Sequence, residues 1–295
     1  MLEIKSGHHR VGIYPALGGA IGYWLCQDTP IFYPLINSHL AKSANQIIAA
    51  YPLLPYSNRI ADGKFEFEGR KYQLDVNALN EKDAIHGNAW EREWELESFS
   101  KNSVTMILCH EPDKDSKKQW PFSYKAQIKY TILETGLSVH LSLQNSDRCN
   151  QPVGLGFHPY FPRKDSVEVG FTAKTVWNNG NDGLPQGRMS IDGRWAFNEM
   201  RALTQDEQLD NCYAGWDNFA FIRWRYSNAY LSITSSHNFQ HLVLFNPENK
   251  PYFTLEPVMN MNNAINMPEI SDRGLTILKP GQRLEGNIFY SFSGD

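Results

Sequence analysis

The chain has 295 residues, and its 28 basic and 32 acidic side chains leave a formal net charge of −4. This near balance of charge excludes the concentrated Lys/Arg surface that nucleic-acid binding requires. The length is sufficient for one large domain with a substantial apolar core. The composition shows no break, linker or repeat, so we expect a single domain over residues 1–295.

The sequence offers no signal for a membrane or for secretion. No apolar stretch approaches the roughly 18 residues that span a bilayer, and the N-terminus lacks the apolar segment of a signal peptide. We therefore expect a cytoplasmic chain with no membrane partner. The cysteines stand far apart without C-x-x-C spacing, which predicts reduced, structural thiols rather than a zinc or redox site; they are Cys26, Cys109, Cys149 and Cys212.

Alternation of apolar and polar residues with period two predicts many short strands. In chain order they are 64–74, 104–110, 125–132, 136–144, 167–176, 219–225, 230–234, 241–245, 252–255, 275–278 and 284–292. Thr135 and Gly136 separate the third and fourth of them, which predicts a hairpin. No stretch of 12 or more residues has a helical period. Short strands separated by turns about ten residues apart predict an all-β fold, a large antiparallel β-sandwich.

Two histidines stand out because imidazole titrates near physiological pH. His86 precedes Gly87 between two predicted strands, where glycine lets the backbone approach another group closely. His158 precedes Pro159, which favours an extended conformation at a strand end. A histidine in either setting is more often structural than catalytic.

One carboxylate and one guanidinium have comparable settings. Glu256 follows the strand 252–255 and precedes Pro257, so it is expected at a strand end, where burial would raise its pKa towards that of a useful base. The alternative is an ordinary solvated carboxylate. Arg59, in the segment Tyr-Ser-Asn-Arg-Ile, is either a polar anchor or a surface arginine.

Seven short motifs in a fixed order resemble those of the aldose 1-epimerase (galactose mutarotase) family, and the resemblance covers nearly the whole chain. Each motif alone is weak, whereas their order is specific. They are YPLLPYSNRI (51–60), GKFEFEG (63–69), IHG (85–87), WPF (120–122), GFHPYF (156–161), LDNCY (209–213) and LEP (255–257) with Asn263 and Ala264.

The resemblance implies a large antiparallel β-sandwich whose open concave face holds a small-molecule sugar, a hexose, with neither a metal nor an organic cofactor. It implies Glu256 as the catalytic base and His158 as the catalytic acid. It further implies that Arg59, His86 and an aspartate hold the sugar hydroxyls. A single sequence does not define the oligomeric state.

The residue types suit mutarotation, which interconverts α and β anomers through the open-chain aldehyde. A base takes the proton of the C1 hydroxyl while an acid protonates the ring oxygen, so one carboxylate and one imidazole on opposite sides of the ring suffice.

The aspartate has two candidates, Asp210 and Asp217. We favour Asp210, because in the family the aspartate comes shortly before an aromatic residue and ahead of the next strand, here predicted from Phe219. Short insertions in such loops are well tolerated, which keeps Asp217 as the alternative.

Two other classes of function compete with the epimerase. A non-catalytic carbohydrate-binding sandwich would keep the hexose pocket without turnover. A glycoside hydrolase needs two carboxylates that flank the scissile bond, whereas the strong motifs here supply a histidine and a glutamate.

Within the epimerases, a hexose-6-phosphate 1-epimerase is the alternative to an enzyme for free sugars. A phosphate calls for additional basic side chains at the rim of the pocket, and the candidates are Arg92, Arg163, Lys164 and Arg188. The segment Asn260-Met-Asn-Asn-Ala264 is more similar to the free-sugar branch, which we favour.

Aromatic residues make up 13% of the chain, and packing in strands accounts for most of them. A minority neighbours the candidate site residues in sequence, and aromatic faces pack well against the C–H face of a sugar. We expect one or two of these residues to form the pocket wall; they are Trp90, Trp120, Tyr160, Phe161 and Trp216.

Overall fold

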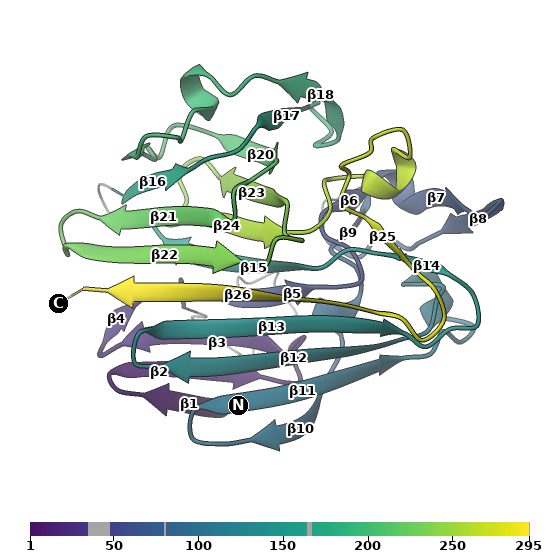
Figure 1. Cartoon of the computed structure of the whole chain (residues 1–295), viewed down its shortest axis with the longest axis horizontal. Helices are drawn as coiled ribbons and strands as arrows, with labels where there is room; N and C mark the ends of the chain where they lie inside the picture. The colour runs from purple at the N-terminus through teal and green to yellow at the C-terminus, as the bar shows by residue number, and fades with distance from the viewer. Residues whose placement is uncertain (35–47, 80, 164–166, 295) are drawn as a thin grey trace.

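The computed structural model describes residues 1–34, 48–79, 81–163 and 167–294, and these are almost entirely β-structure. The strands form two large antiparallel sheets that pack face to face (Figure 1). The predicted large antiparallel β-sandwich is therefore confirmed. None of the helical turns in the described ranges is long and apolar enough to cross a membrane.

The first sheet contains eleven strands of the described residues. In spatial order they are β1 (Leu2–Ser6), β2 (His9–Tyr14), β3 (Ala20–Cys26), β5 (Ala50–Leu53), β15 (Gly156–Pro162), β24 (Tyr252–Val258), β23 (His241–Asn246), β20 (Leu209–Ala214), β17 (Thr175–Asn179) and β18 (Pro185–Met189), with β4 (Thr29–Pro30) paired to β3.

The second sheet contains nine strands, counted over the same described residues. In spatial order they are β10 (Glu95–Phe99), β11 (Ser103–His110), β12 (Tyr124–Leu133), β13 (Gly136–Asn145), β26 (Arg283–Ser293), β22 (Ala229–Ser235), β21 (Phe219–Trp224), β16 (Val167–Phe171) and β19 (Arg201–Ala202).

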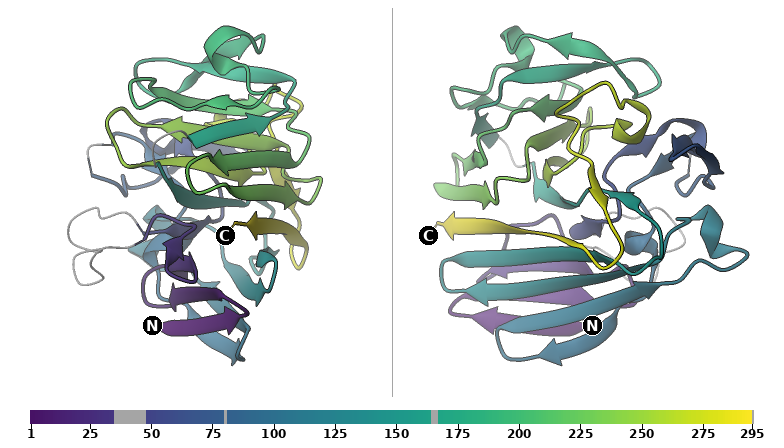
Figure 2. Two further views of the ribbon diagram at one scale, coloured as in Figure 1. Left: turned by 90° about the vertical axis from the view of Figure 1, so that its left-hand side faces the viewer. Right: turned by 45° about the vertical axis from the view of Figure 1, so that its right-hand side comes forward.

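Three short two-stranded pairs lie together at one end of the sandwich (Figures 1 and 2). They are β6 (Arg59–Ile60) with β9 (Ala84–Ile85), β7 (Lys64–Phe67) with β8 (Arg70–Gln73), and β14 (Gln151–Val153) with β25 (Thr276–Leu278). Single 3-10 turns occur at η1 (Ala61–Gly63), η2 (Ala89–Glu91), η3 (Ser116–Lys118), η4 (Gly193–Trp195) and η5 (Ala264–Asn266).

The apolar core lies between the two sheets and contains most of the large aromatic side chains. Tyr290 of β26 lies 6.3 Å from Trp24 of β3 and 6.2 Å from Phe157 of β15, measured between ring centroids. Phe157 also lies 6.2 Å from Tyr130 of β12. Since alternate residues of a strand point to opposite faces, the neighbours of Phe157 in β15 point away from the core.

The predicted hairpin is the most regular part of the fold. β12 and β13 pair without interruption from Tyr124 opposite Asn145 to Leu133 opposite Gly136. The alternation of the two strands buries Ile128 and Leu141 completely. In this hairpin the period-two alternation of apolar residues predicts both strands and the face that each one buries.

Two predicted strands are wrong in extent. The stretch 64–74 is a hairpin of β7 and β8, because Glu68 and Gly69 both adopt positive φ (49° and 73°) and turn the chain. The stretch 167–176 is divided between β16 of the second sheet and β17 of the first. Apolar residues lie on both sides of this crossover, so the sequence pattern does not reveal it.

Several strands have no counterpart in the prediction, among them β1 to β5, β15 and β20. The strand β24 is longer than predicted and runs through Glu256 and Pro257 to Val258. Glu256, His158 and Asp210 therefore lie within strands β24, β15 and β20, not at strand ends or in a loop.

Candidate active site

Strand register brings side chains from four strands into one row on the outer face of the first sheet. His158 of β15 pairs with Tyr51 of β5, and Val243 of β23 pairs with Glu256 of β24. The pairs Gly156↔Val258 and Tyr160↔Thr254 place His158 opposite Glu256. The row therefore reads Tyr51, His158, Glu256, Val243 across the sheet.

A second row lies two residues further along the same strands. Tyr160 pairs with Thr254, Thr254 with Phe245, and Phe245 with Asp210 of β20. Residues two apart on a strand share a face, so Asp210 and Tyr160 point to the same side of the sheet as Glu256 and His158.

The sheet is interrupted between β15 and β24 where the two rows meet. No backbone pairing joins these strands between Gly156↔Val258 and Tyr160↔Thr254. Pro159 and Pro257 lie in this stretch, and proline has no N–H to donate to a ladder. His158 and Glu256 each precede one of these prolines and face each other across the interruption.

His158 and Glu256 are in direct contact. The Nε2 atom of His158 lies 3.1 Å from Oε1 of Glu256, and the two residues are 6% and 2% exposed. The two groups are therefore adjacent, whereas the expectation from the sequence was an acid and a base on opposite sides of a sugar ring. Oε1 also accepts a hydrogen bond of 2.7 Å from the hydroxyl of Thr254.

Burial shifts the pKa values of this pair in opposite directions. Loss of water raises the pKa of Glu256 to about 8, and the Thr254 hydroxyl partly opposes the shift. Loss of water lowers the pKa of His158 to about 3. Between these values burial favours a protonated carboxyl beside a neutral imidazole. The corresponding ion pair holds the same number of protons and differs only in which group carries one of them.

Two tyrosine rings pack against the imidazole of His158. Tyr51 stacks on it at 4.7 Å and 18°, and Tyr160 at 4.7 Å and 29°. The Tyr51 contact follows from cross-strand pairing, and the Tyr160 contact from the spacing of two along β15. The tyrosine rings therefore fix the plane of the imidazole.

His86 lies against this cluster as a neutral hydrogen-bond donor. Its ring meets that of His158 edge-on at 5.2 Å, and its Nδ1 accepts the backbone N–H of Asn58 at 3.1 Å. The remaining ring proton is therefore on Nε2. Burial, His158 and Arg59 all lower the pKa of His86, which favours this neutral form.

The close approach expected at Gly87 is confirmed. The backbone of Leu54 passes so near that an added Cβ at Gly87 would lie 2.0 Å from the Leu54 carbonyl oxygen, and φ is +66°. His86 itself has φ +63°. This backbone geometry carries the imidazole to the outer face of the sheet.

Arg59 enters the site from β6 and is held by two carboxylates. Its Nε and Nη2 donate to Glu81 at 3.1 and 2.7 Å, and its Nη1 lies 3.8 Å from Oδ2 of Asp210. Loss of surrounding water raises the pKa of Asp210, and the positive charge of Arg59 opposes this shift. Gly183 closes one side, since an added Cβ there would lie 3.2 Å from Arg59 Cζ.

The loop that carries Arg59 is held by the asparagines of the 260–263 segment. Asn260 Oδ1 accepts the Ser57 N–H at 3.1 Å, and Asn262 Oδ1 accepts the Arg59 N–H at 3.1 Å. Asn263 Oδ1 accepts the N–H of Ala61, also at 3.1 Å. The segment that resembles the free-sugar branch therefore contacts the loop backbone, and its residues do not line the cavity described next.

All five predicted site residues line one cavity of about 970 Å³. This size falls within the range of small-molecule sites. Further walls come from the rows above, from residues 76–79 and 81, and from the segment 85–91. The lining residues are Leu17, Ile48, Tyr51, Asn58, Arg59, Val76, Asn77, Ala78, Leu79, Glu81, Ile85, His86, Trp90, Glu91, His158, Tyr160, Asp210, Val243, Phe245, Tyr252 and Glu256.

No group of three or more His, Cys, Asp or Glu side chains within the described ranges is arranged to hold a metal ion. Among the cavity carboxylates, Glu81, Asp210 and Glu256 contact Arg59, His158 and Thr254. Glu91 accepts a hydrogen bond from Asn77. These side chains can bind hydroxyl groups and exchange protons.

The aromatic candidates divide into two groups. Trp90 and Tyr160 line the cavity. Trp120, Phe161 and Trp216 belong to the apolar core instead and are 0%, 0% and 4% exposed. Phe161 is on the inward parity of β15 and Trp120 lies in a core cluster, so proximity in sequence to a site motif is a poor guide to side-chain direction.

Asp217 lies outside the cavity. Its side chain is exposed and accepts the backbone N–H of Phe219 at 3.2 Å, as expected for a turn. Of the two aspartate candidates, only Asp210 lines the site.

The basic residues considered for a phosphate are also elsewhere. Arg92 donates to Gln119, Arg163 is buried against Asn246, and neither lines the cavity. Lys164 lies outside the described residues.

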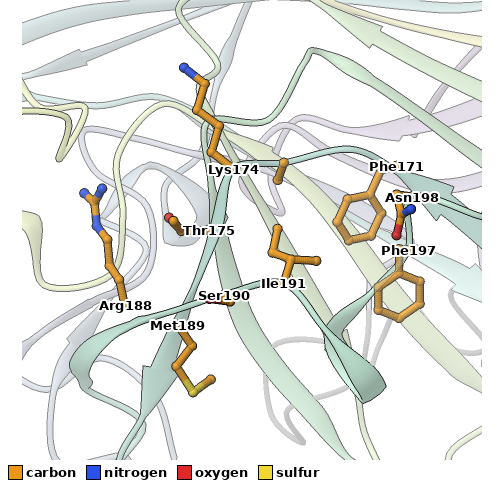
Figure 3. Close-up of a pocket in the computed structure, with 10 residues that line it drawn as sticks. Phe171, Lys174, Thr175, Arg188, Met189, Ser190, Ile191, Phe197 and Asn198 are labelled. Atoms are coloured by element: carbon orange, nitrogen blue, oxygen red, sulfur yellow. The ribbon is translucent and has the colours of Figure 1, made fainter.

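Arg188 lines a second cavity of about 550 Å³, between the β16–β17 crossover and β18 (Figure 3). It also forms an ion pair with Asp272. Phe171 and Phe197 form an aromatic wall there, and Lys174 extends from the crossover. None of the ten described lining residues is Asp, Glu or His, so this cavity lacks an acid/base pair.

Glu81 and Thr254, which contact Arg59 and Glu256, escaped the sequence analysis. Glu81 lies in a polar loop, where a glutamate gives no signal of a partner. Thr254 falls within the predicted strand 252–255, where a β-branched residue is common. Its period-two relation to Glu256 is visible in the sequence, and would have found it once Glu256 was assumed to lie within the strand.

Comparison with known proteins gives consistent matches over the whole chain. The family model described as aldose 1-epimerase matches residues 1–291. The uncharacterized protein YphB of Escherichia coli K12 is 26% identical over 279 residues, which cover 90% of this chain and 89% of that protein.

Two solved structures show the same fold. A putative aldose 1-epimerase from E. coli K12 superposes with a TM-score of 0.89 at 22% identity, and the match covers 99% of this chain and 98% of the other. A galactose mutarotase-like protein from Clostridium acetobutylicum superposes with a TM-score of 0.86 at 18% identity, covering 99% and 95%.

Proposed function

The chain belongs to the aldose 1-epimerase family, and from this premise we propose that it is an isomerase that interconverts the α and β anomers of a hexose. The observation that carries the proposal is the contact of 3.1 Å between His158 Nε2 and Glu256 Oε1 in a cavity of about 970 Å³. A buried acid/base pair in a cavity of this size is typical of general acid/base catalysis.

The adjacency of the two groups suits the reacting atoms. The C1 hydroxyl oxygen and the ring oxygen of a pyranose are bonded to the same carbon. Two groups in mutual contact can therefore reach both oxygens from one side of the sugar. A general acid or base needs heavy-atom distances of roughly 2.6 to 3.2 Å to the atom it serves.

In ring opening, Glu256 as a carboxylate takes the proton of the C1 hydroxyl. The electrons of that O–H bond form the C1=O bond, the bond from C1 to the ring oxygen breaks, and His158 as an imidazolium protonates the ring oxygen through Nε2. The pair ends as a protonated carboxyl and a neutral imidazole, the state that burial favours.

Ring closure reverses these transfers. After rotation about the C1–C2 bond, the hydroxyl that had been the ring oxygen attacks the other face of the aldehyde. Its proton returns to His158, and Glu256 donates its proton to the aldehyde oxygen, which becomes the new C1 hydroxyl. The pair regains its starting state, so one proton in the pair serves the whole cycle.

We assign binding of the remaining hydroxyls to His86, Arg59 and Asp210. The Nε2–H of His86 and the unused N–H groups of Arg59 donate hydrogen bonds to hydroxyl oxygens of the sugar. The carboxylate of Asp210 accepts a hydrogen bond from a sugar hydroxyl. Trp90 and Tyr160 offer apolar faces to the C–H side of the ring.

Anomer exchange measured by NMR on glucose and galactose tests the proposal. We expect an exchange rate above the spontaneous one that increases in proportion to protein concentration. Hexose binding without faster exchange would contradict the proposal and identify a non-catalytic carbohydrate-binding protein.

A further inference from the structure

The charge of the cavity departs from what an anionic sugar requires. Among the described lining residues, Arg59 alone is a permanent cation, whereas Glu81, Glu91, Asp210 and Glu256 are carboxylic acids. A sugar phosphate or a sugar acid needs uncommitted positive charge in its site.

Glu81 occupies the side of the Arg59 guanidinium formed by Nε and Nη2, where an anion could accept two parallel hydrogen bonds. The Nε and Nη2 of Arg59 both donate to the two oxygens of Glu81, which is the paired geometry that Arg adopts with carboxylates and phosphates. The two side chains are only 16% and 25% exposed, so solvent screens the pair weakly.

Asp210 covers the remaining approach. It lies 3.8 Å from Nη1, which is too far for a hydrogen bond but close enough to repel an anion. The N–H groups of Arg59 that Glu81 does not engage can still donate to a hydroxyl, because a neutral oxygen carries no charge for Asp210 to repel.

We infer that Glu81 is a specificity-determining residue that restricts this cavity to uncharged sugars by engaging Arg59, and this inference rests on the proposed function. By chemistry, the substrates are neutral aldoses. Hexose 6-phosphates and hexuronic acids are excluded by the carboxylates around Arg59.

The test compares wild type, Glu81→Gln and Glu81→Ala with glucose, glucuronate and glucose 6-phosphate. For each sugar, NMR gives the anomer-exchange rate and titration gives the affinity. Glu81→Gln removes the charge and keeps the size of the side chain, and Glu95→Gln on the exposed strand β10 is the matched control for loss of one negative charge.

We expect wild type to prefer glucose over both anionic sugars. Glu81→Gln and Glu81→Ala should raise the kcat/KM of at least one anion relative to glucose by about tenfold or more, because removal of a like charge frees the Arg59 edge. Glu95→Gln should leave the ratio unchanged.

The outcomes separate the two proposals. One outcome is that wild type speeds glucose exchange above the spontaneous rate while the kcat/KM of the anionic sugars relative to glucose stays the same in both Glu81 variants. This outcome overturns the role of Glu81 and leaves the proposed function intact. If no sugar exchanges faster in wild type, the proposed function fails, and the affinities alone then decide the role of Glu81. A wild type that prefers an anionic sugar overturns the selectivity itself.

Discussion

Two regions of the sandwich differ in how regular they are. In the hairpin of β12 and β13, ten consecutive residue pairs follow one register. Apolar and polar side chains alternate from Tyr124 to Ile132 and from Leu137 to Leu143. Between β15 and β24 the backbone pairing stops for three residues, two prolines face this break, and an imidazole and a carboxyl group are buried together. The first region supplies stability, whereas the second gives up hydrogen bonds and buries titratable groups.

The largest effect should come from matched substitutions in the two regions. His158→Asn and Glu256→Gln should each slow anomer exchange by about 10² to 10⁴, the usual contribution of one proton-transfer group. His140→Asn on β13 and Glu285→Gln on β26 change the same residue types on the outer face of the regular sheet, and should leave the rate within about twofold by the same reasoning. NMR exchange measures all four variants. A rate near wild type in either of the first two contradicts its assignment.

Two tryptophans separate stability from binding in the same way. Trp120→Ala should lower the free energy of unfolding by about 3 to 5 kcal/mol, because it empties a fully buried site. Trp90→Ala at the cavity wall should weaken hexose binding about 2- to 10-fold, with little loss of stability. Denaturant unfolding and sugar titration measure the two effects. Normal hexose affinity in Trp90→Ala would return that residue to a purely structural role.

The pKa values of the buried pair predict how rate depends on pH. The pair needs one transferable proton, so the rate should fall as pH rises through about 8, where Glu256 loses it. It should also fall towards pH 3, where His158 gains a second one. A pH–rate profile on a neutral hexose checks both limbs, and a rate still rising above pH 9 would contradict this proton count.

The raised pKa of Glu256 also predicts how the stability advantage of Glu256→Gln over wild type depends on pH. The folded state raises the pKa of Glu256 from about 4.5 to about 8, so its native form binds the proton more tightly and stability is lost as pH rises through this window. Glutamine keeps the uncharged form. The gain in Tm of Glu256→Gln over wild type should therefore be larger at pH 9 than at pH 5, while Glu285→Gln shows no such trend.

The smallest effect should come from Thr254→Val, which removes the hydroxyl that donates to Glu256. Loss of this hydrogen bond should raise the pKa of Glu256 further, by up to about one unit, and move the alkaline limb of the pH–rate profile to higher pH. Thr234→Val on the exposed face of β22 is the matched control and should leave the profile unchanged. An alkaline limb that moves to lower pH would contradict the role of Thr254.

Periodicity predicted the regular region and failed where the chain changes sheets or turns. The hairpin of β12 and β13 needed only local alternation, whereas the stretch 167–176 keeps its apolar residues across a crossover between sheets. Glu68 at positive φ shows the same limit, because nothing in its residue type marks a turn.

The candidate site was predictable as a set of residues and not as a geometry. The prolines after His158 and Glu256 marked both positions, and the motif resemblance linked them. Their contact depends on the register between strands nearly one hundred residues apart, which no local pattern encodes. Glu81 was missed for the same reason, since its partner Arg59 meets it only through the tertiary fold.

The asparagines that hold the Arg59 loop are synthesised long after the loop itself, so this part of the site forms late in synthesis. Asn260 and Asn262 bond residues 203 positions earlier, and at roughly 5 to 20 residues per second the ribosome needs about 10 to 40 s to make that distance. Until then the backbone of Ser57 and Arg59 has no such partners. The apolar hairpins of the first half can associate early, whereas the cavity that contains Arg59 is completed only after the last strands of the first sheet have been synthesised.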